Sequence, residues 1–139
     1  NRLHETHLLP IILGKSIKGE PIKVFGDDYA TKDGSCIRDY VHVEDIADGH
    51  LLAIENIGKN PNGKYNLGSG KGYSVFDVIR SSEDVTGLKV KYEIVSRRAG
   101  DPAVLVASNE LAKTELGWLP VRSDLNRIVK DTFDWIKKL

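Results

Sequence analysis

The stretch YVHVEDIADGHLLAIENI, residues 40–57, decides the fold class that this sequence predicts. Its first four residues are rich in aromatic and β-branched side chains, which favours a strand. Glu44 and Asp45 follow, and acidic residues are favoured in the first turn of a helix because of the helix dipole. Residues 46–57 then supply apolar side chains for one face of that helix. The stretch therefore predicts a strand that runs directly into a helix, which is the unit of an α/β fold.

Working outward from this stretch, short strands and helices alternate along the rest of the chain. Further strands are expected at residues 22–25, 64–67, 90–94 and 104–106, and a long loop at residues 26–35. Each further helix has a candidate N-cap, and these are Thr6, Ser74, Ser108 and Ser123. The last helix has the clearest amphipathic stripe. With no repeat and no low-complexity linker, the pattern predicts one mixed α/β unit.

The charge balance and the cysteine count narrow the classes of function. The 139 residues hold 20 Lys and Arg against 20 Asp and Glu, so a nucleic-acid or membrane surface built on bulk charge is not expected. Cys36 is the single cysteine and no Cys/His cluster has zinc spacing, so neither an intrachain disulfide nor a metal site is expected. No apolar run is long enough to span a membrane, and we expect a cytoplasmic protein. The sequence lacks methionine and begins at Asn1, which suggests a piece of a longer protein.

Four charged residues in turns are the candidates for ligand binding: Arg38, Arg97, Arg98 and Asp101. An arginine matches the geometry of phosphate oxygens, and a carboxylate can accept hydrogen bonds from neighbouring sugar hydroxyls. Together they would suit a phosphorylated sugar or a nucleotide. The alternative is that each arginine pairs with a local acid on the surface, Arg38 with Asp39 or Arg98 with Asp101. The spacing of these residues leaves both interpretations open.

The common catalytic and cofactor motifs are absent. The sequence contains no G-x-G-x-x-G after a strand, no G-x-S-x-G, no H-E-x-x-H and no P-loop. None of its tyrosines is followed four residues later by lysine. The residues alone therefore point to no catalytic base, nucleophile or cofactor site.

Five segments carry a resemblance to a known family: ETHLLP (5–10), the run FGDDYATKDGSCIRDYVHVEDIADGH (25–50), YNLGSG (65–70), RRAGDPA (97–103) and ELGW (115–118). In this order they resemble the C-terminal part of the UDP-glucose 4-epimerase family, within the extended short-chain dehydrogenases/reductases. The R-D-Y-x-H-V-x-D segment at residues 38–45 is similar across that whole group. The D-Y-x-T-x-D-G-[ST] loop before it resembles the 4-epimerases rather than the nucleotide-sugar dehydratases and decarboxylases.

The resemblance implies that residues 1–139 form the C-terminal UDP-sugar-binding domain of a longer, homodimeric enzyme of galactose metabolism. In that family an N-terminal Rossmann domain, missing here, holds NAD and the catalytic tyrosine, and the enzyme interconverts UDP-glucose and UDP-galactose by oxidation and reduction at C4. This chain is therefore expected to carry no catalytic and no NAD-binding residue and to be inactive alone. An apolar face at Ile46, Leu51 and Ile54 is expected to be left uncovered. A free-standing UDP-sugar or protein-binding module without catalysis is the alternative from another class.

Eight residues match family positions that bind the UDP-sugar. His7 and Leu8 match positions at the sugar cleft, and Lys23, Val24 and Phe25 match a strand end that lies along the uracil. The remaining three are Arg38, Arg98 and Asp101.

The resemblance assigns Arg38 and Arg98 to the diphosphate and Asp101 to the ribose. His7 stands where some members have asparagine, and the segment after Asp101 lacks a tyrosine that some members place near the hexose. The resemblance therefore leaves the choice of hexose open.

Overall fold

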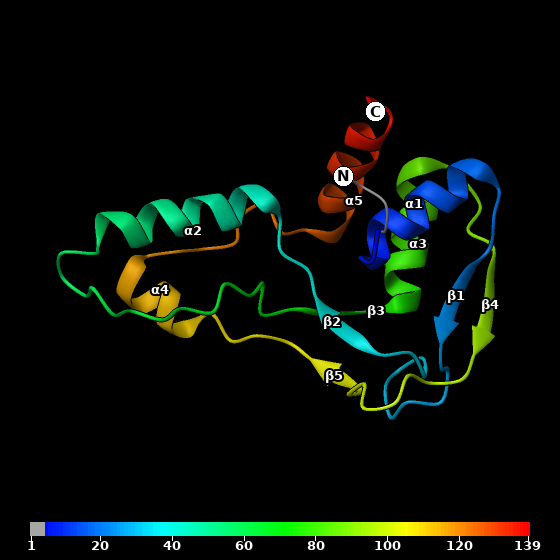
Figure 1. Cartoon of the computed structure of the whole chain (residues 1–139), viewed down its shortest axis with the longest axis horizontal. Coiled ribbons are helices and arrows are strands. Elements are labelled where there is room, and N and C mark those ends of the chain that lie inside the picture. The colour runs from blue at the N-terminus through cyan, green and yellow to red at the C-terminus, as the bar shows by residue number, and fades with distance from the viewer. Residues whose placement is uncertain (1–4) are drawn as a thin grey trace.

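The computed structural model describes residues 5–139, which form an α/β fold of short strands alternating with helices (Figure 1). In chain order the elements are α1 (Leu8–Lys18), β1 (Ile22–Phe25), β2 (Ile37–Asp39), α2 (Val43–Glu55), β3 (Gly72–Ser74), α3 (Val75–Thr86), β4 (Tyr92–Val95), β5 (Val104–Leu105), α4 (Glu110–Leu116) and α5 (Leu125–Ile136). The predicted fold class is confirmed. No helix among residues 5–139 combines the length and apolar character needed to cross a membrane.

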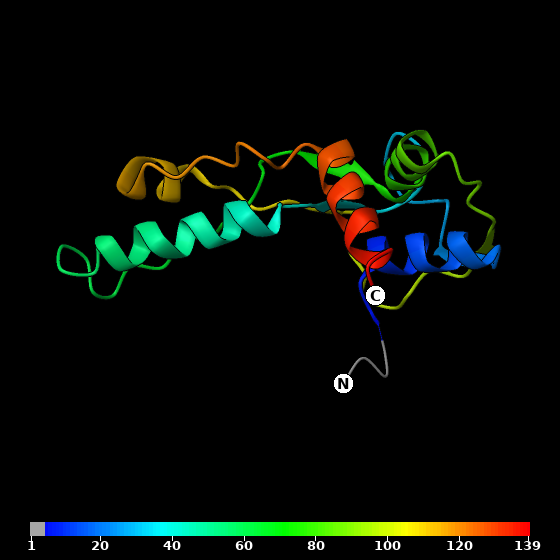
Figure 2. The same ribbon diagram turned by 90° about the horizontal axis from the view of Figure 1, so that it is seen from above.

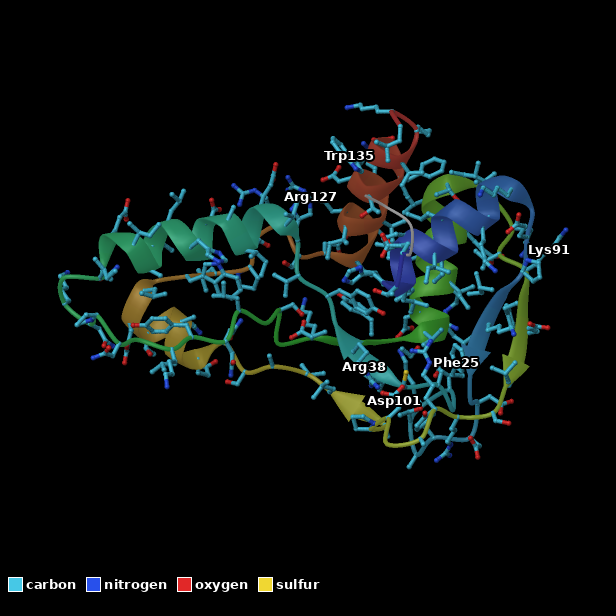
Figure 3. The ribbon with its side chains drawn as sticks, viewed as in Figure 1. Phe25, Arg38, Lys91, Asp101, Arg127 and Trp135 are labelled. Carbon is cyan, nitrogen blue, oxygen red and sulfur yellow. The ribbon has the colours of Figure 1, made fainter. Side chains whose placement is uncertain are left out.

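The main core lies where α1, α3 and α5 pack together beside the parallel pair of strands β1 and β4. Ile12 and Leu13 of α1, Val78 of α3 and Val129 of α5 are completely buried there. The predicted stripe of α5 accounts for its packing, because Leu125, Ile128 and Val129 face this core. Trp135, at the far end of the same stripe, is exposed (Figure 3).

A second, smaller core joins α2 to α4. Leu116 and Trp118 are buried in it, and Leu52 and Leu67 pack against them. Both views show α2 and α4 extending away from α1, α3 and α5 (Figure 1 and Figure 2). The chain is therefore elongated, with its two cores at opposite ends.

A three-stranded sheet in the order β3-β2-β5 lies between the two cores. In it β2 is central, antiparallel to β3 and parallel to β5. Arg38 stands opposite Tyr73 on one side and Leu105 on the other. This pairing brings three distant parts of the chain together around the middle of β2.

Two of the predicted strands are wrong. Residues 40–42 are irregular, because His42 serves as the N-cap of α2 and its Nδ1 accepts a hydrogen bond of 3.1 Å from the backbone N–H of Glu44. No strand forms at residues 64–67; β2 pairs instead with Gly72–Ser74. A Cβ at Gly72 would lie 2.4 Å from Cγ2 of Ile37, so glycine allows the close approach of these two strands.

The predicted helix caps are right in one case and displaced in three. Ser74 and Asp77 form the predicted capping box of α3. The other three candidates each lie one residue before the N-cap that the structure shows, which is His7, Asn109 or Asp124. In α5 the Asp124 side chain accepts the capping bond because Ser123 is engaged elsewhere, donating to Asp45 at 2.6 Å.

Candidate functional site

A pocket of about 440 Å³ opens between α1, β1, β2 and the turn at residues 98–101. Its wall includes seven of the eight residues that the sequence assigned to UDP-sugar binding: Leu8, Lys23, Val24, Phe25, Arg38, Arg98 and Asp101. Phe25 at the end of β1, Arg38 in the middle of β2 and Asp101 in the turn before β5 lie close together (Figure 3). The structure therefore brings four separate parts of the sequence to one pocket.

Strand alternation sets how β1 contributes to the pocket. Ile22 and Val24 are each only 1% exposed and anchor the strand in the main core. Lys23 and Phe25 alternate with them and keep exposed surface. At Gly26 the backbone turns with φ of 88°, a conformation that favours glycine, so the chain leaves the strand directly after Phe25.

Arg38 and Asp101 form an ion pair across 63 residues of sequence. Nη2 of Arg38 donates to Oδ1 of Asp101, and Nη1 donates to the backbone carbonyl of Ile37 at 2.7 Å. The two side chains keep only 23% and 29% of their surface exposed. The local pairs considered from the sequence are thus wrong, since Asp39 binds the loop at Ser69 instead.

The two neighbouring arginines at positions 97 and 98 point to different surroundings. The guanidinium of Arg98 lies 3.9 Å from the ring centroid of Phe25, on the pocket wall. Arg97 lies 4.2 Å from the ring centroid of Tyr29 and pairs with Asp28, and neither it nor its partner lines the pocket. Only Arg98 of the two can therefore meet a ligand in this pocket.

The electrostatics of the pocket favour an anion. Lys15, Lys23, Arg38 and Arg98 supply four cations to the wall, against the one carboxylate of Asp101. Burial raises the pKa of the Tyr40 hydroxyl to about 12, so this side chain is neutral at physiological pH. Burial also raises the pKa of the Cys36 thiol, although the nearby Arg38 opposes that effect. The pocket is thus positively charged and suited to phosphate oxygens.

His7 is the predicted site residue that the structure does not bring to this pocket. Its side chain is 84% exposed, and Nδ1 pairs with Oε1 of Glu5 at 2.7 Å. It lines a second pocket, of about 930 Å³, together with His42 and Trp135. Its neighbours Thr6 and Leu8 line the first pocket, so His7 lies at the boundary between the two. Its assignment to the ligand stays a prediction.

Several pocket residues were missed by the sequence reasoning. Cys36 and Tyr40 flank Arg38 within the quoted motif and line the wall with it. Counted from Leu8, Ile11 is at i+3 and Lys15 at i+7 on the same face of α1, and all three line the pocket. Helical spacing from Leu8 was the signal that would have found Lys15.

Most of the R-D-Y-x-H-V-x-D segment holds the fold together rather than facing the pocket. The Asp45 carboxylate is completely buried and accepts from the backbone N–H of Arg122 at 2.9 Å and from the Ser123 hydroxyl at 2.6 Å. Nε2 of His42 lies 3.1 Å from Oδ2 of Asp131, on α5. Because Nδ1 of His42 already accepts a bond, Nε2 is assigned as the donor. These contacts connect the N-terminal end of α2 to α5 and to residues 122–123, which precede α5.

Neither a metal site nor a dinucleotide site is found in this part of the chain. Among residues 5–139, no three His, Cys, Asp or Glu side chains are grouped so that they could hold a metal ion. Gly68 and Gly70 precede β3 and Gly72 begins it, and the three do not form a G-x-G-x-x-G sequence.

Comparisons with known proteins show which families this chain resembles. Residues 1–68 match the model of the NAD dependent epimerase/dehydratase family. The chain is 48% identical over 136 residues to the UDP-glucose 4-epimerase of Halalkalibacterium halodurans, covering 96% of this chain and 41% of that protein. The corresponding Corynebacterium glutamicum enzyme is 46% identical, covering 100% of this chain and 43% of that protein.

The fold of this chain is also similar to solved structures of UDP-glucose 4-epimerases. The crystal structure of UDP-glucose-4-epimerase from Stenotrophomonas maltophila, with bound NAD and formylated UDP-arabinopyranose, matches with a TM-score of 0.91 and 39% identity, over 99% of this chain and 41% of that one. The chain thus spans about two fifths of the length of the relatives that it matches. The predicted resemblance is confirmed: residues 1–68 match the NAD dependent epimerase/dehydratase family, and the chain as a whole is similar in sequence and in structure to UDP-glucose 4-epimerases.

Proposed function

We propose that this chain is the C-terminal, UDP-sugar-binding domain of a UDP-glucose 4-epimerase, a longer cytoplasmic and homodimeric enzyme that interconverts UDP-glucose and UDP-galactose in galactose metabolism. The observation that carries the proposal is the positively charged pocket that seven of the eight assigned residues line. The Stenotrophomonas relative, which holds a UDP-sugar, supports it.

Each group on the pocket wall has a chemical task in this proposal. Arg38 and Arg98 bind the diphosphate, for which a guanidinium supplies charged and directional donors. Asp101 accepts hydrogen bonds from the ribose hydroxyls. Phe25 offers an aromatic face for the uracil. These residues bind and orient the substrate and transfer no proton or hydride.

NAD belongs to the rest of the enzyme in this proposal. The residues present do not fit a dinucleotide, because no glycine-rich phosphate loop follows a strand and no Tyr-x-x-x-Lys pair occurs. NAD would accept hydride from C4 of the sugar and return it. No step of that transfer is assigned to this chain.

An exposed apolar stripe on α2 supports the assignment of this chain as one domain of a larger protein. Val43, Leu51 and Ile54 are 75%, 60% and 65% exposed, and with exposed Ala47 they follow one face of the helix. Ile46, which was expected on this face, is half-buried. Burying such a stripe on a further domain would remove apolar surface from water.

The proposal is tested with the full-length protein, by its turnover of UDP-galactose to UDP-glucose and by calorimetry with UDP. The expected result is turnover together with UDP binding. Binding without turnover, and without a G-x-x-G-x-x-G or Tyr-x-x-x-Lys upstream of Asn1, would instead indicate a binding module. Failure to bind UDP would contradict both.

A further inference from the structure

The two charged residues assigned to different parts of the ligand are bound to each other. Arg38, assigned to the diphosphate, donates to Oδ1 of Asp101, assigned to the ribose. The two residues belong to neighbouring segments, since the backbone N–H of Ile37 donates to the carbonyl of Ala103 at 2.8 Å and β2 pairs with β5. Backbone pairing therefore holds Arg38 beside the segment that directly follows Asp101.

The contacts of Arg38 restrict how its guanidinium can be oriented. Nη1 is bound to the carbonyl of Ile37 and Nη2 to Asp101, so two of the five N–H donors of the group are occupied. The other three remain for a ligand, and the side chain lines the pocket. Among residues 5–139, the Asp101 carboxylate accepts a hydrogen bond at Oδ1, and none is found at its Oδ2 atom.

We propose that Asp101 is a positioning residue for Arg38, so that one carboxylate couples recognition of the ribose to recognition of the diphosphate. The inference rests on the proposed function, because UDP is the ligand that both residues face. Oδ1 holds the guanidinium while Oδ2 stays available for a ribose hydroxyl. An arginine already held in its binding orientation loses less conformational freedom when the ligand arrives.

The direction in which diphosphate binding changes when Asp101 is replaced distinguishes a positioning role from direct charge repulsion. A carboxylate near a diphosphate repels it, so removing the charge of Asp101 should strengthen the binding of phosphate groups if that charge acts alone. If Asp101 instead positions Arg38, its removal should weaken the same binding. The two roles therefore predict opposite changes.

The experiment uses 2′,3′-dideoxy-UDP, which lacks the ribose hydroxyls and so cannot form hydrogen bonds with Asp101 through them; only the charge of Asp101 and its effect on Arg38 remain. Its affinity for the full-length protein is measured by calorimetry for Asp101→Ala, Asp101→Asn, Arg38→Ala and the Arg38→Ala/Asp101→Ala double variant. Asp28→Ala is the matched control, because Asp28 also pairs with an arginine, Arg97, but lies outside the pocket. Melting temperatures verify that every variant is folded.

We expect Asp101→Ala to weaken the binding of dideoxy-UDP about tenfold, near the lower end of the effect of one hydrogen bond to a charged group. In the Arg38→Ala background the same substitution should change the affinity less than about twofold, because the group it positions is gone. Asp101→Asn, which keeps an oxygen acceptor, should lie between Asp101→Ala and the wild type, and Asp28→Ala should match the wild type.

An unchanged or stronger affinity of Asp101→Ala for dideoxy-UDP would overturn the positioning role while leaving the proposed function intact. So would a tenfold loss that persists in the Arg38→Ala background. A wild-type protein that does not bind UDP at all would contradict the proposed function itself.

Discussion

Replacing the two pocket arginines one at a time should weaken UDP binding by different amounts. Arg38 is already oriented by Asp101 and the Ile37 carbonyl, so it need not break a contact to meet the ligand. A hydrogen bond to a charged group contributes about 1.5–3 kcal/mol, which predicts a loss of about 13- to 160-fold for Arg38→Ala.

Arg98 should contribute less, because its guanidinium lies over the ring of Phe25 in the free protein. That cation–π contact is worth about 0.5–1 kcal/mol at an exposed site. If it is lost when the ligand binds, that loss offsets part of the free energy gained from the hydrogen bond between Arg98 and the diphosphate. The net effect of Arg98→Ala is then about 0.5–2.5 kcal/mol, or about 2- to 70-fold in affinity.

The assay is calorimetry with UDP on the full-length enzyme, together with its bound NAD content, which should not change in either variant. Arg97→Ala is the matched control, being the adjacent arginine with its own partner Asp28 outside the pocket. It should bind UDP like the wild type. A loss in Arg97→Ala as large as that in Arg98→Ala, or loss of NAD with unchanged UDP affinity, would refute the assignment of the pocket.

Four further outcomes are expected. The isolated chain should not convert UDP-galactose, with or without added NAD, since it holds neither the NAD fingerprint nor a Tyr-x-x-x-Lys pair; measurable turnover by the pure chain would contradict this. Asp45→Ala should lower the free energy of unfolding by about 3 kcal/mol in urea titration, because buried donors worth roughly 1–3 kcal/mol each lose their acceptor. Asp134→Ala, which removes only ion pairs with the surface residues Lys130 and Lys137, should lower it far less. At pH 8 the thiol of Cys36, the sole cysteine, should be alkylated more slowly than in an unfolded control, because burial raises its pKa, and the two rates should converge as the pH rises. Bound UDP should slow the reaction further, since Cys36 lines the pocket; a fast reaction whose rate does not change with UDP would count against the pocket. The isolated chain should self-associate in light scattering through α2, and Leu51→Glu/Ile54→Glu should make it monomeric; equal particle sizes would exclude that face.

Local chemistry explains the features that could be read from the sequence. The capping box of Ser74 and Asp77 spans four residues, and Gly87, in the left-handed conformation, ends the same helix. The buried side of α5 follows from its 3.6-residue period. The resemblance, carried by motifs, selected the residues that surround the pocket. All of this depends on interactions within a few residues of sequence, or on motifs that stay contiguous.

The partner of each charged or pairing group was decided only by the tertiary structure. Arg38 has Asp39 beside it in sequence, yet it binds Asp101, because β2 lies parallel to β5 and brings that carboxylate within reach. The strand expected at residues 64–67 was wrong because the partner of β2 is Gly72–Ser74, where the absence of a side chain at Gly72 leaves room for Ile37. Strand pairing and ion pairing join groups far apart in the chain, and their energies depend on positions that packing sets. Local pattern therefore determined the helices, whereas long-range register determined the strand partners and the site.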